Sequence, residues 1–124
     1  MTDWLKMCKA DKSITVEGNK IRVQLGNHRY HHVEINDTGD ALELKAIVAR
    51  RGAIIDIENL AIRVWCRNRG AQLLGFKIDK HGHLIGETWI PKAGLTLEEL
   101  HLYIIKVALE SDRFEYLLTG KDRE

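Results

Sequence analysis

The segment at residues 94–100, GLTLEEL, carries the clearest secondary-structure signal in the chain. The Thr96 hydroxyl can accept a hydrogen bond from the backbone N–H of Glu99, and the Glu99 carboxylate can bond back, which is the capping box that begins a helix. The apolar residues that follow predict a helix to about Leu118, ended by Gly120. This boundary constrains the rest of the fold, because a long terminal helix needs a surface to cover.

The predicted last helix is apolar over more than half of its circumference. Its polar side is essentially Glu99, Lys106, Glu110 and Arg113. Such a helix needs cover from more than one direction. A single sheet covers one side only, so we expect a further contact, such as a second copy of the chain.

Residues 13–50 alternate between apolar and polar with a period of two, which predicts antiparallel strands. Gly18 and Asn19 predict a two-residue turn between the first two strands. The resulting hairpin would have the cross-strand pairs Ile14–Val23, Val16–Ile21 and Glu17–Lys20. Further strands are predicted around residues 30–35 and 41–50, separated by the turn NDTGD.

The stretch GNHRYHHVEIND, residues 26–37, contains His28, His31 and His32. In a strand, His31 and His32 point to opposite faces, and His28 and His32 lie roughly 13 Å apart, too far to share an ion. We therefore expect one half-buried and one surface histidine here, and no metal site from this segment alone.

The second half of the chain predicts a helix, a hairpin and the last helix. Asp56 is the expected N-cap of a helix ending at Gly70. Its apolar stripe, expected to face the sheet, is Ile57, Leu60, Ala61, Val64 and Trp65. Strands around residues 74–78 and 83–91 follow, joined by the turn DKHG, and a short helix capped by Thr2 is expected at the amino terminus.

Length and composition fit one soluble globular domain over residues 1–124. The fold class is α+β: an antiparallel sheet with helices packed on one face, in the order α-β-β-β-β-α-β-β-α. The formal net charge is +1 and no apolar run could span a bilayer, so no membrane partner is expected. The start lacks a secretory signal, which predicts a cytoplasmic protein, and Cys8 and Cys66 are expected to be buried thiols.

No known catalytic or cofactor motif is present. The glycines do not form G-x-G-x-x-G or a Walker loop, and neither H-E-x-x-H nor G-x-S-x-G occurs. His81 and His83 flank Gly82, but no carboxylate is tied to them by spacing, so a solvated turn shaped by Asp79 is the expectation. The sequence predicts no enzyme, no cofactor and no metal.

Two surfaces are candidates for binding a partner. Arg63 and Arg67 stack on one helix face and could touch phosphates, although positive charge near a helix carboxyl terminus is also favourable without a ligand. The second candidate is an apolar patch on the sheet face away from the helices, which would mark a protein contact unless the amino-terminal helix covers it. Its members are Ile47, Leu73, Ile85 and Trp89.

The order of elements, with NLAIRVWCRNRG at residues 59–70, DKHGHL at 79–84, GLTLEEL at 94–100 and ESDRFEYLLTG at 110–120, resembles the type III secretion chaperone-like fold. Within it, the chain is similar to the YbjN-like group of bacterial sensory transduction regulators. The resemblance implies a small homodimer that binds segments of other proteins, and it supplies no catalytic residues. True secretion chaperones are usually acidic, whereas this chain is nearly neutral.

Together these observations predict a non-enzymatic protein-binding module with a chaperone-like or regulatory role. The alternative is a nucleic-acid-binding protein that uses the helix face of Arg63 and Arg67. The partner's apolar segment would pack near Ile85 and Trp89, or a partner strand would add to a sheet edge.

Overall fold

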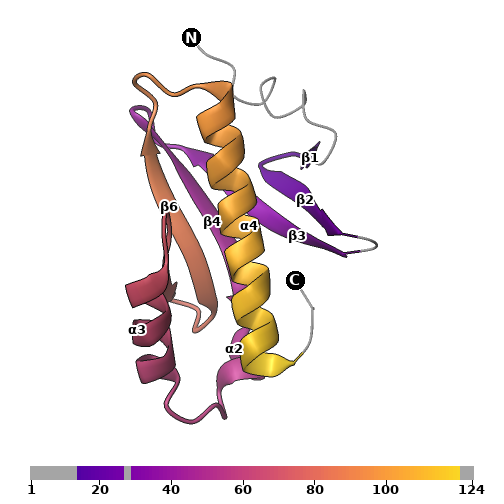
Figure 1. Ribbon diagram of the computed structural model, residues 1–124, viewed down its shortest axis with the longest axis vertical. Helices are drawn as coiled ribbons and strands as arrows, with labels where there is room; N and C mark the ends of the chain where they lie inside the picture. Colours follow the sequence, from indigo (N-terminus) through magenta and orange to yellow (C-terminus); the bar gives the residue numbers. More distant parts are fainter. Residues whose placement is uncertain (1–13, 27–28, 121–124) are drawn as a thin grey trace.

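The computed structural model describes residues 14–26 and 29–120, which form a six-stranded antiparallel sheet and three helices (Figure 1). The order of strands across the sheet is β1-β2-β3-β4-β6-β5. The strands are β1 (Ile14–Glu17), β2 (Lys20–Gly26), β3 (Arg29–Asp37), β4 (Ala41–Ala49), β5 (Gly75–Ile78) and β6 (Leu84–Pro91). The predicted helix after Thr2 lies outside the described residues.

The first hairpin has the predicted register, with Ile14 opposite Val23 and Val16 opposite Ile21. Gly18 has φ +66°, a left-handed conformation that glycine adopts without steric cost, as a tight hairpin turn requires. Apolar pairs therefore lie on one face of the sheet, which fixes the side that must be covered.

Helix α4 (Leu97–Thr119) covers that face and crosses β2, β3, β4 and β6 (Figure 1). The predicted N-cap is confirmed: the Thr96 hydroxyl oxygen accepts from the Glu99 N–H at 3.2 Å, and Gly120 ends the helix at φ +71°. The Glu99 carboxylate accepts from the Thr96 hydroxyl at 3.0 Å. Leu100, Ile104 and Val107 of α4 are buried against the sheet. The sheet side of this core is made by the inward-facing residues Val33, Ile35, Leu42, Leu44, Ala46 and Ile90.

A second apolar cluster lies towards the carboxyl-terminal end of α4. The rings of Phe76 on β5 and Phe114 on α4 meet edge to face, with centroids 4.9 Å apart. Val48, Leu84 and Ile54 complete this cluster. This cluster packs the short helix α2 (Arg51–Ile54) and the end of α4 against β5 and β6, on the same side of the sheet as the main core.

Helix α3 (Leu60–Gly70) begins later than the sequence predicted. Residues 51–54 form α2, which was not predicted, and the chain turns before α3 starts. Its N-cap is Asn59 at φ +57° rather than Asp56, because asparagine tolerates the left-handed backbone that this turn requires.

The expected burial of the α3 apolar stripe is also corrected. Val64 is half-buried, but Ala61 and Trp65 are exposed, and the helix has no buried residue. Cys66, expected inside, is an exposed free thiol. Within residues 14–26 and 29–120, no helix is long and apolar enough to cross a membrane.

Candidate protein-binding surfaces

The sheet face opposite α4, here called the open face, carries three of the four residues predicted to bind a partner. Register places Ile47 opposite Ile85 and Glu43 opposite Trp89, with Lys45 opposite Glu87 between these pairs. Leu84 and Ile90 of β6 belong to the clusters packed under the helices, so the odd-numbered residues of this strand face outward.

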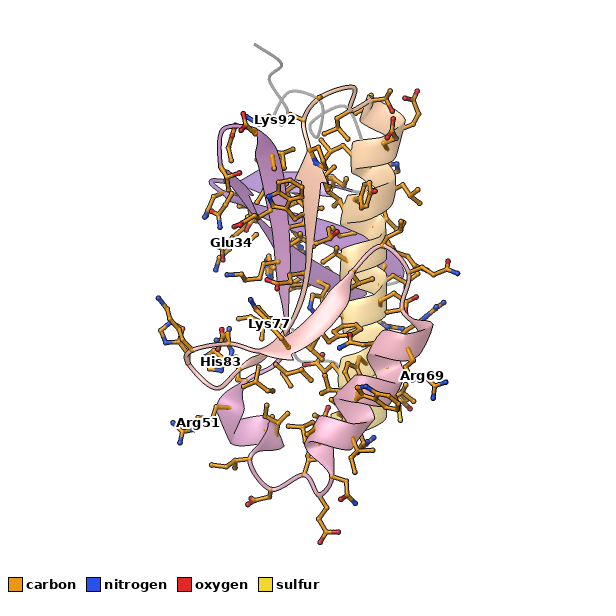
Figure 2. The ribbon with its side chains drawn as sticks, turned by 90° about the vertical axis from the view of Figure 1, so that its left-hand side faces the viewer. Glu34, Arg51, Arg69, Lys77, His83 and Lys92 are labelled. Carbon is orange, nitrogen blue, oxygen red and sulfur yellow. The ribbon has the colours of Figure 1, made fainter. Side chains whose placement is uncertain are left out.

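The expected contiguous apolar patch is interrupted. Ile85 is only 1% exposed, because β6 is an internal strand and Ile85 is flanked by Ile47 on β4 and Lys77 on β5. Lys77 also forms an ion pair with Glu87 at 2.9 Å, and the two charged side chains separate the isoleucines from Trp89. Figure 2 shows Lys77 and Glu34 on the side of the sheet away from α4.

Trp89 is a large apolar side chain that the open face presents to solvent, with 59% of its surface exposed. Leu73, the fourth predicted contact, lies in the loop between α3 and β5 and is 41% exposed. Gly75 of β5 pairs with Glu87, so Leu73 and Trp89 both lie towards the same end of the β5–β6 pair.

The backbone at Leu73 has φ +70°, a conformation that is costly for a residue with a branched side chain. Leu73 therefore adopts an unfavourable backbone conformation while burying little of its apolar side chain. Strained residues of this kind are concentrated at ligand clamps and switch regions.

Helix α3 presents a second apolar surface. Ile62 is 62% exposed and Trp65 is 59% exposed. The Arg69 guanidinium lies 5.1 Å from the centre of the Trp65 ring and covers part of it. Large apolar side chains on a helix with no buried residue are typical of a contact surface.

The arginines proposed for nucleic-acid binding connect α3 to α4 in the structure. Arg67 pairs with Glu110 at 3.0 Å, and its guanidinium lies 5.5 Å from the centre of the Phe114 ring. Arg63 donates to the Leu117 carbonyl at 3.1 Å. Both side chains therefore help to hold α3 against α4.

A cleft of about 890 Å³ lies between α3, α4 and the adjoining ends of β2 and β3. Its lining includes Leu25, Arg29, Asp112 and Tyr116. Arg29 forms an ion pair with Asp112, which is 2% exposed at the base of the cleft.

Asn68 of α3 bonds to the backbone of β5 as a neighbouring strand would. Its side-chain amide donates to the Phe76 carbonyl at 3.0 Å, and its carbonyl oxygen accepts from the Phe76 N–H at 2.7 Å. The outer edge of β5 is therefore already bonded at its centre.

The predicted contrast between His31 and His32 is confirmed. His31 is fully buried under α4, whereas the His32 side chain is 41% exposed on the open face. The surroundings of His31 were not predicted: Asp112 and Glu115 of α4 are buried beside it. A sequence signal existed, since these two acids continue the i, i+3, i+4 line of Ile104 and Ala108, but only the fold brings that line over residue 31.

The turn at residues 79–83 is shaped by Asp79, as expected. Slight burial raises the pKa of Asp79, but hydrogen bonds from the N–H groups of His83 and His81 and the nearby imidazoles outweigh it, so the pKa is below its usual value. The His83 ring accepts from the Arg51 N–H at 2.9 Å, and Figure 2 shows these residues side by side. His83 therefore holds the start of α2.

Comparison with known proteins finds no matching family model and no matching curated protein. Three solved structures are similar over most of the chain. A chain in the crystal structure of the ExsC–ExsE complex has TM-score 0.59 and 18% identity, covering 87% of this chain and 83% of that one.

A chain in the heterodimeric complex ExoU–SpcU, from the type III secretion system of Pseudomonas aeruginosa, has TM-score 0.67 and 10% identity, covering 98% of this chain and 100% of that one. For the HopA1–SchA chaperone–effector complex the values are 0.55 and 9%, covering 94% and 89%. At these identities the likeness concerns the fold, and it agrees with the strand order and helix placement described above. The chain has the α+β fold of type III secretion chaperones.

Proposed function

We propose that this chain is a non-enzymatic protein-binding module with a chaperone-like or regulatory role, acting as a homodimer in the cytoplasm. The observation that carries the proposal is Trp89, 59% exposed on the open face. A tryptophan in that position gives a partner a large apolar contact at little cost in conformational entropy. The solved structures with this fold include complexes of two proteins, one of them a chaperone with its effector. The YbjN-like group of bacterial regulators remains the family that we propose for this chain.

The partner would contribute an apolar segment that packs against Trp89 and Leu73. The left-handed backbone and exposure of Leu73 support this placement, because a contact with a partner would offset both costs. Ile47 and Ile85 lie further along the same face, and Ile85 adds little contact area because it is only 1% exposed. Addition of a strand to β5 is less favourable, because Asn68 occupies the outward N–H and C=O groups of Phe76.

The homodimer would form through α3. This helix has exposed Ile62 and Trp65. On α4, Tyr116 and Leu117 are each 58% exposed, and both line the cleft that borders α3. A second copy of the chain would supply the further cover that the sequence of α4 predicts.

A crossed pair of substitutions tests both surfaces. Trp89→Ala should abolish capture of a nuclease-resistant protein partner from the native extract and leave the dimer intact by light scattering. Trp65→Ala should have the opposite effect, shifting the mass to that of a monomer. Trp89→Ala should unfold at a temperature close to that of the wild type, since Trp89 is not buried. Trp65→Ala should lose only the stability that dimerisation adds.

Two outcomes would contradict the proposal. A large loss of thermal stability in Trp89→Ala would make that residue part of the core. Capture that disappears on nuclease treatment would favour nucleic acid and the arginines of α3. The structure does not favour that alternative, because Arg63 and Arg67 both bond to α4.

A further inference from the structure

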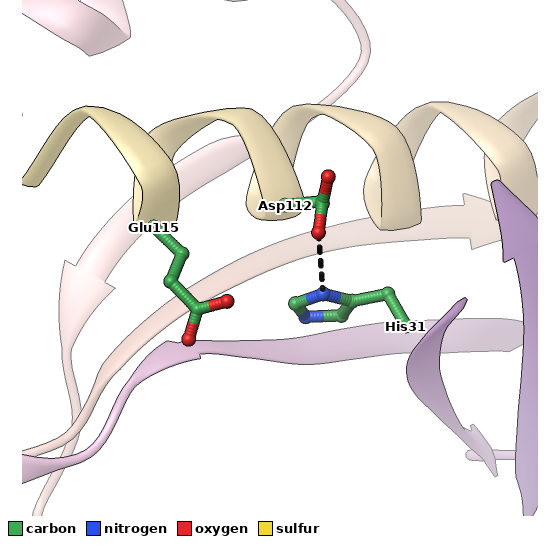
Figure 3. Close-up of side chains that lie close together, drawn as sticks. All are labelled: His31, Asp112 and Glu115. Atoms are coloured by element: carbon green, nitrogen blue, oxygen red, sulfur yellow. Dashed lines mark ion pairs between the residues drawn. The ribbon is translucent and has the colours of Figure 1, made fainter. Parts of the chain in front are cut away.

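Three ionisable side chains are buried together where β3 passes under α4 (Figure 3). His31 is 0% exposed, Asp112 is 2% and Glu115 is 1%. One ligand-type atom from each lies within 4.8 Å of the other two. Ionisable groups are rarely buried to this extent unless they are paired or bind an ion.

The orientation of the His31 ring is set by β4. Its Nε2 lies 2.7 Å from the Ile47 carbonyl oxygen. A carbonyl oxygen only accepts, so Nε2 carries the hydrogen and donates it. In the neutral ring, the lone pair is then on Nδ1, which lies 3.9 Å from Asp112 Oδ1 and faces that carboxylate, with Glu115 beside the ring (Figure 3). Metal-binding histidines commonly donate their second ring N–H to a backbone carbonyl in this way.

Asp112 is oriented by a second contact. Its Oδ2 pairs with Arg29, which leaves Oδ1 directed at His31. Ligating carboxylates are usually held by such an outer hydrogen bond.

We propose that His31 Nδ1, Asp112 and Glu115 bind a divalent transition metal of the Zn²⁺ class, joining β3 to α4. One nitrogen and two carboxylate oxygens suit Zn²⁺, and three protein ligands leave a fourth position for water. Tetrahedral bonds of about 2.0–2.2 Å place ligand atoms about 3.3–3.6 Å apart. The 3.9 Å between Nδ1 and Oδ1 therefore needs only a small closure. Arg29 and Asp112 line the cleft beside α3, which gives an entry path.

The test uses the full chain, freed of metal with a chelator and then titrated with Zn²⁺ alone by equilibrium dialysis. We expect one ion per chain and a higher unfolding temperature with Zn²⁺ than without it, because an ion that binds only the folded state stabilises it. In Glu115→Gln the affinity should fall by more than about 100-fold, since changes even to outer-shell partners cost 10–100-fold.

Control variants separate this site from surface binding. His32→Gln removes the neighbouring histidine on the open face, and the double variant His81→Gln/His83→Gln removes the pair in the 79–83 turn, whose ring centroids are 6.2 Å apart. Neither should change the stoichiometry or the affinity. Loss of Zn²⁺ binding in the double variant, with binding retained in Glu115→Gln, would overturn the proposal.

A measurement on the wild-type chain needs no folded variant. In ¹⁵N spectra of the imidazoles, one equivalent of Zn²⁺ should shift Nδ1 of His31 and leave Nε2 protonated. Unchanged His31 signals at one equivalent would overturn the proposal. So would a metal-free imidazole that is protonated on both nitrogens and stays so on adding Zn²⁺, because the proton would then occupy the place of the metal.

Discussion

At the scale of single residues, α4 approaches the sheet closely at Gly86. A Cβ built on this glycine would lie 2.6 Å from Ser111 Oγ and 3.0 Å from a carbon of the Phe76 ring. A glycine weakens the interior of a strand, and it is often found there because another group must approach the backbone closely. Here the approaching group is α4 itself, so Gly86 determines how near the helix packs.

Gly86→Ala should lower the free energy of unfolding by about 1–3 kcal/mol, the usual cost of inserting a methyl group into a packed interior. Urea denaturation would measure the loss. Adding Ser111→Ala should restore part of it, because the nearest clashing atom is removed. Gly70→Ala, where nothing lies within 4 Å, is the matched control and should be close to neutral. An equal loss in both single variants would mean that packing against α4 is not the cause.

Single residues also show where reasoning from sequence is limited. Strand alternation alone predicted that His31 and His32 point to opposite faces. The neighbours of His31 could not be predicted, because Asp112 and Glu115 lie more than 80 positions away and meet it only through the crossing of α4 over β3.

At the scale of elements, Glu110 is one of the residues that join α4 to α3. This carboxylate, 13% exposed, accepts from Arg67 at 3.0 Å and from Arg113 at 3.2 Å, with Lys106 at 3.4 Å. Arg67 comes from α3, whereas the other two are on α4 itself. The Glu110 carboxylate therefore forms ion pairs within α4 and also an ion pair between α4 and α3.

Glu110→Gln should destabilise the chain by about 1.5–3 kcal/mol, the range for hydrogen bonds to charged groups. Chemical denaturation should show this loss of stability. In the variant, the backbone amides of α3 should exchange hydrogen faster than those of the sheet. Arg113→Gln is the control, since that side chain is 58% exposed and such a pair contributes about 0.2–1 kcal/mol. Equal losses in the two variants would show that the junction with α3 does not depend on Glu110.

The elements differ in how far the sequence specifies them. The first hairpin and α4 were predicted with their register and caps, because a two-residue turn and a capping box are local signals. The start of α3 was predicted wrongly, because Asp56 is a good N-cap by type but the backbone turns at Asn59. Trp65 was placed inside because helical periodicity identifies an apolar stripe without saying what covers it.

At the scale of the whole molecule, charge gives little attraction to nucleic acid. Nineteen basic and eighteen acidic residues give a formal net charge of +1. Long-range steering needs a larger or more localised field. The pairing of Arg67 with Glu110 weakens the basic cluster further.

We therefore expect the wild-type chain to elute from heparin at low salt, and Arg63→Gln to elute at the same point. Elution over a series of salt concentrations would measure this. Each phosphate contact contributes about 0.9 to the slope of log affinity against log salt. A steep slope that falls by about one in Arg63→Gln would contradict the expectation and support binding to phosphate.

The fold class could be predicted at this scale because the order of the elements is readable from their periods. The candidate surfaces could be predicted only in part. Alternation placed Ile85 and Trp89 on one face, but exposure depends on the neighbours across the sheet, and these bury Ile85 and leave Trp89 in solvent.

The contact between Asn68 and Phe76 has a consequence for behaviour at high concentration. Exposed sheet edges are where folded chains stack into aggregates and fibrils. In the described part of the chain the two edge strands, β1 and β5, have four residues each, and the middle of β5 already bonds to Asn68. The sheet thus offers a second molecule only short templates for growth, which lets the chain keep apolar side chains in solvent with less risk of polymerising.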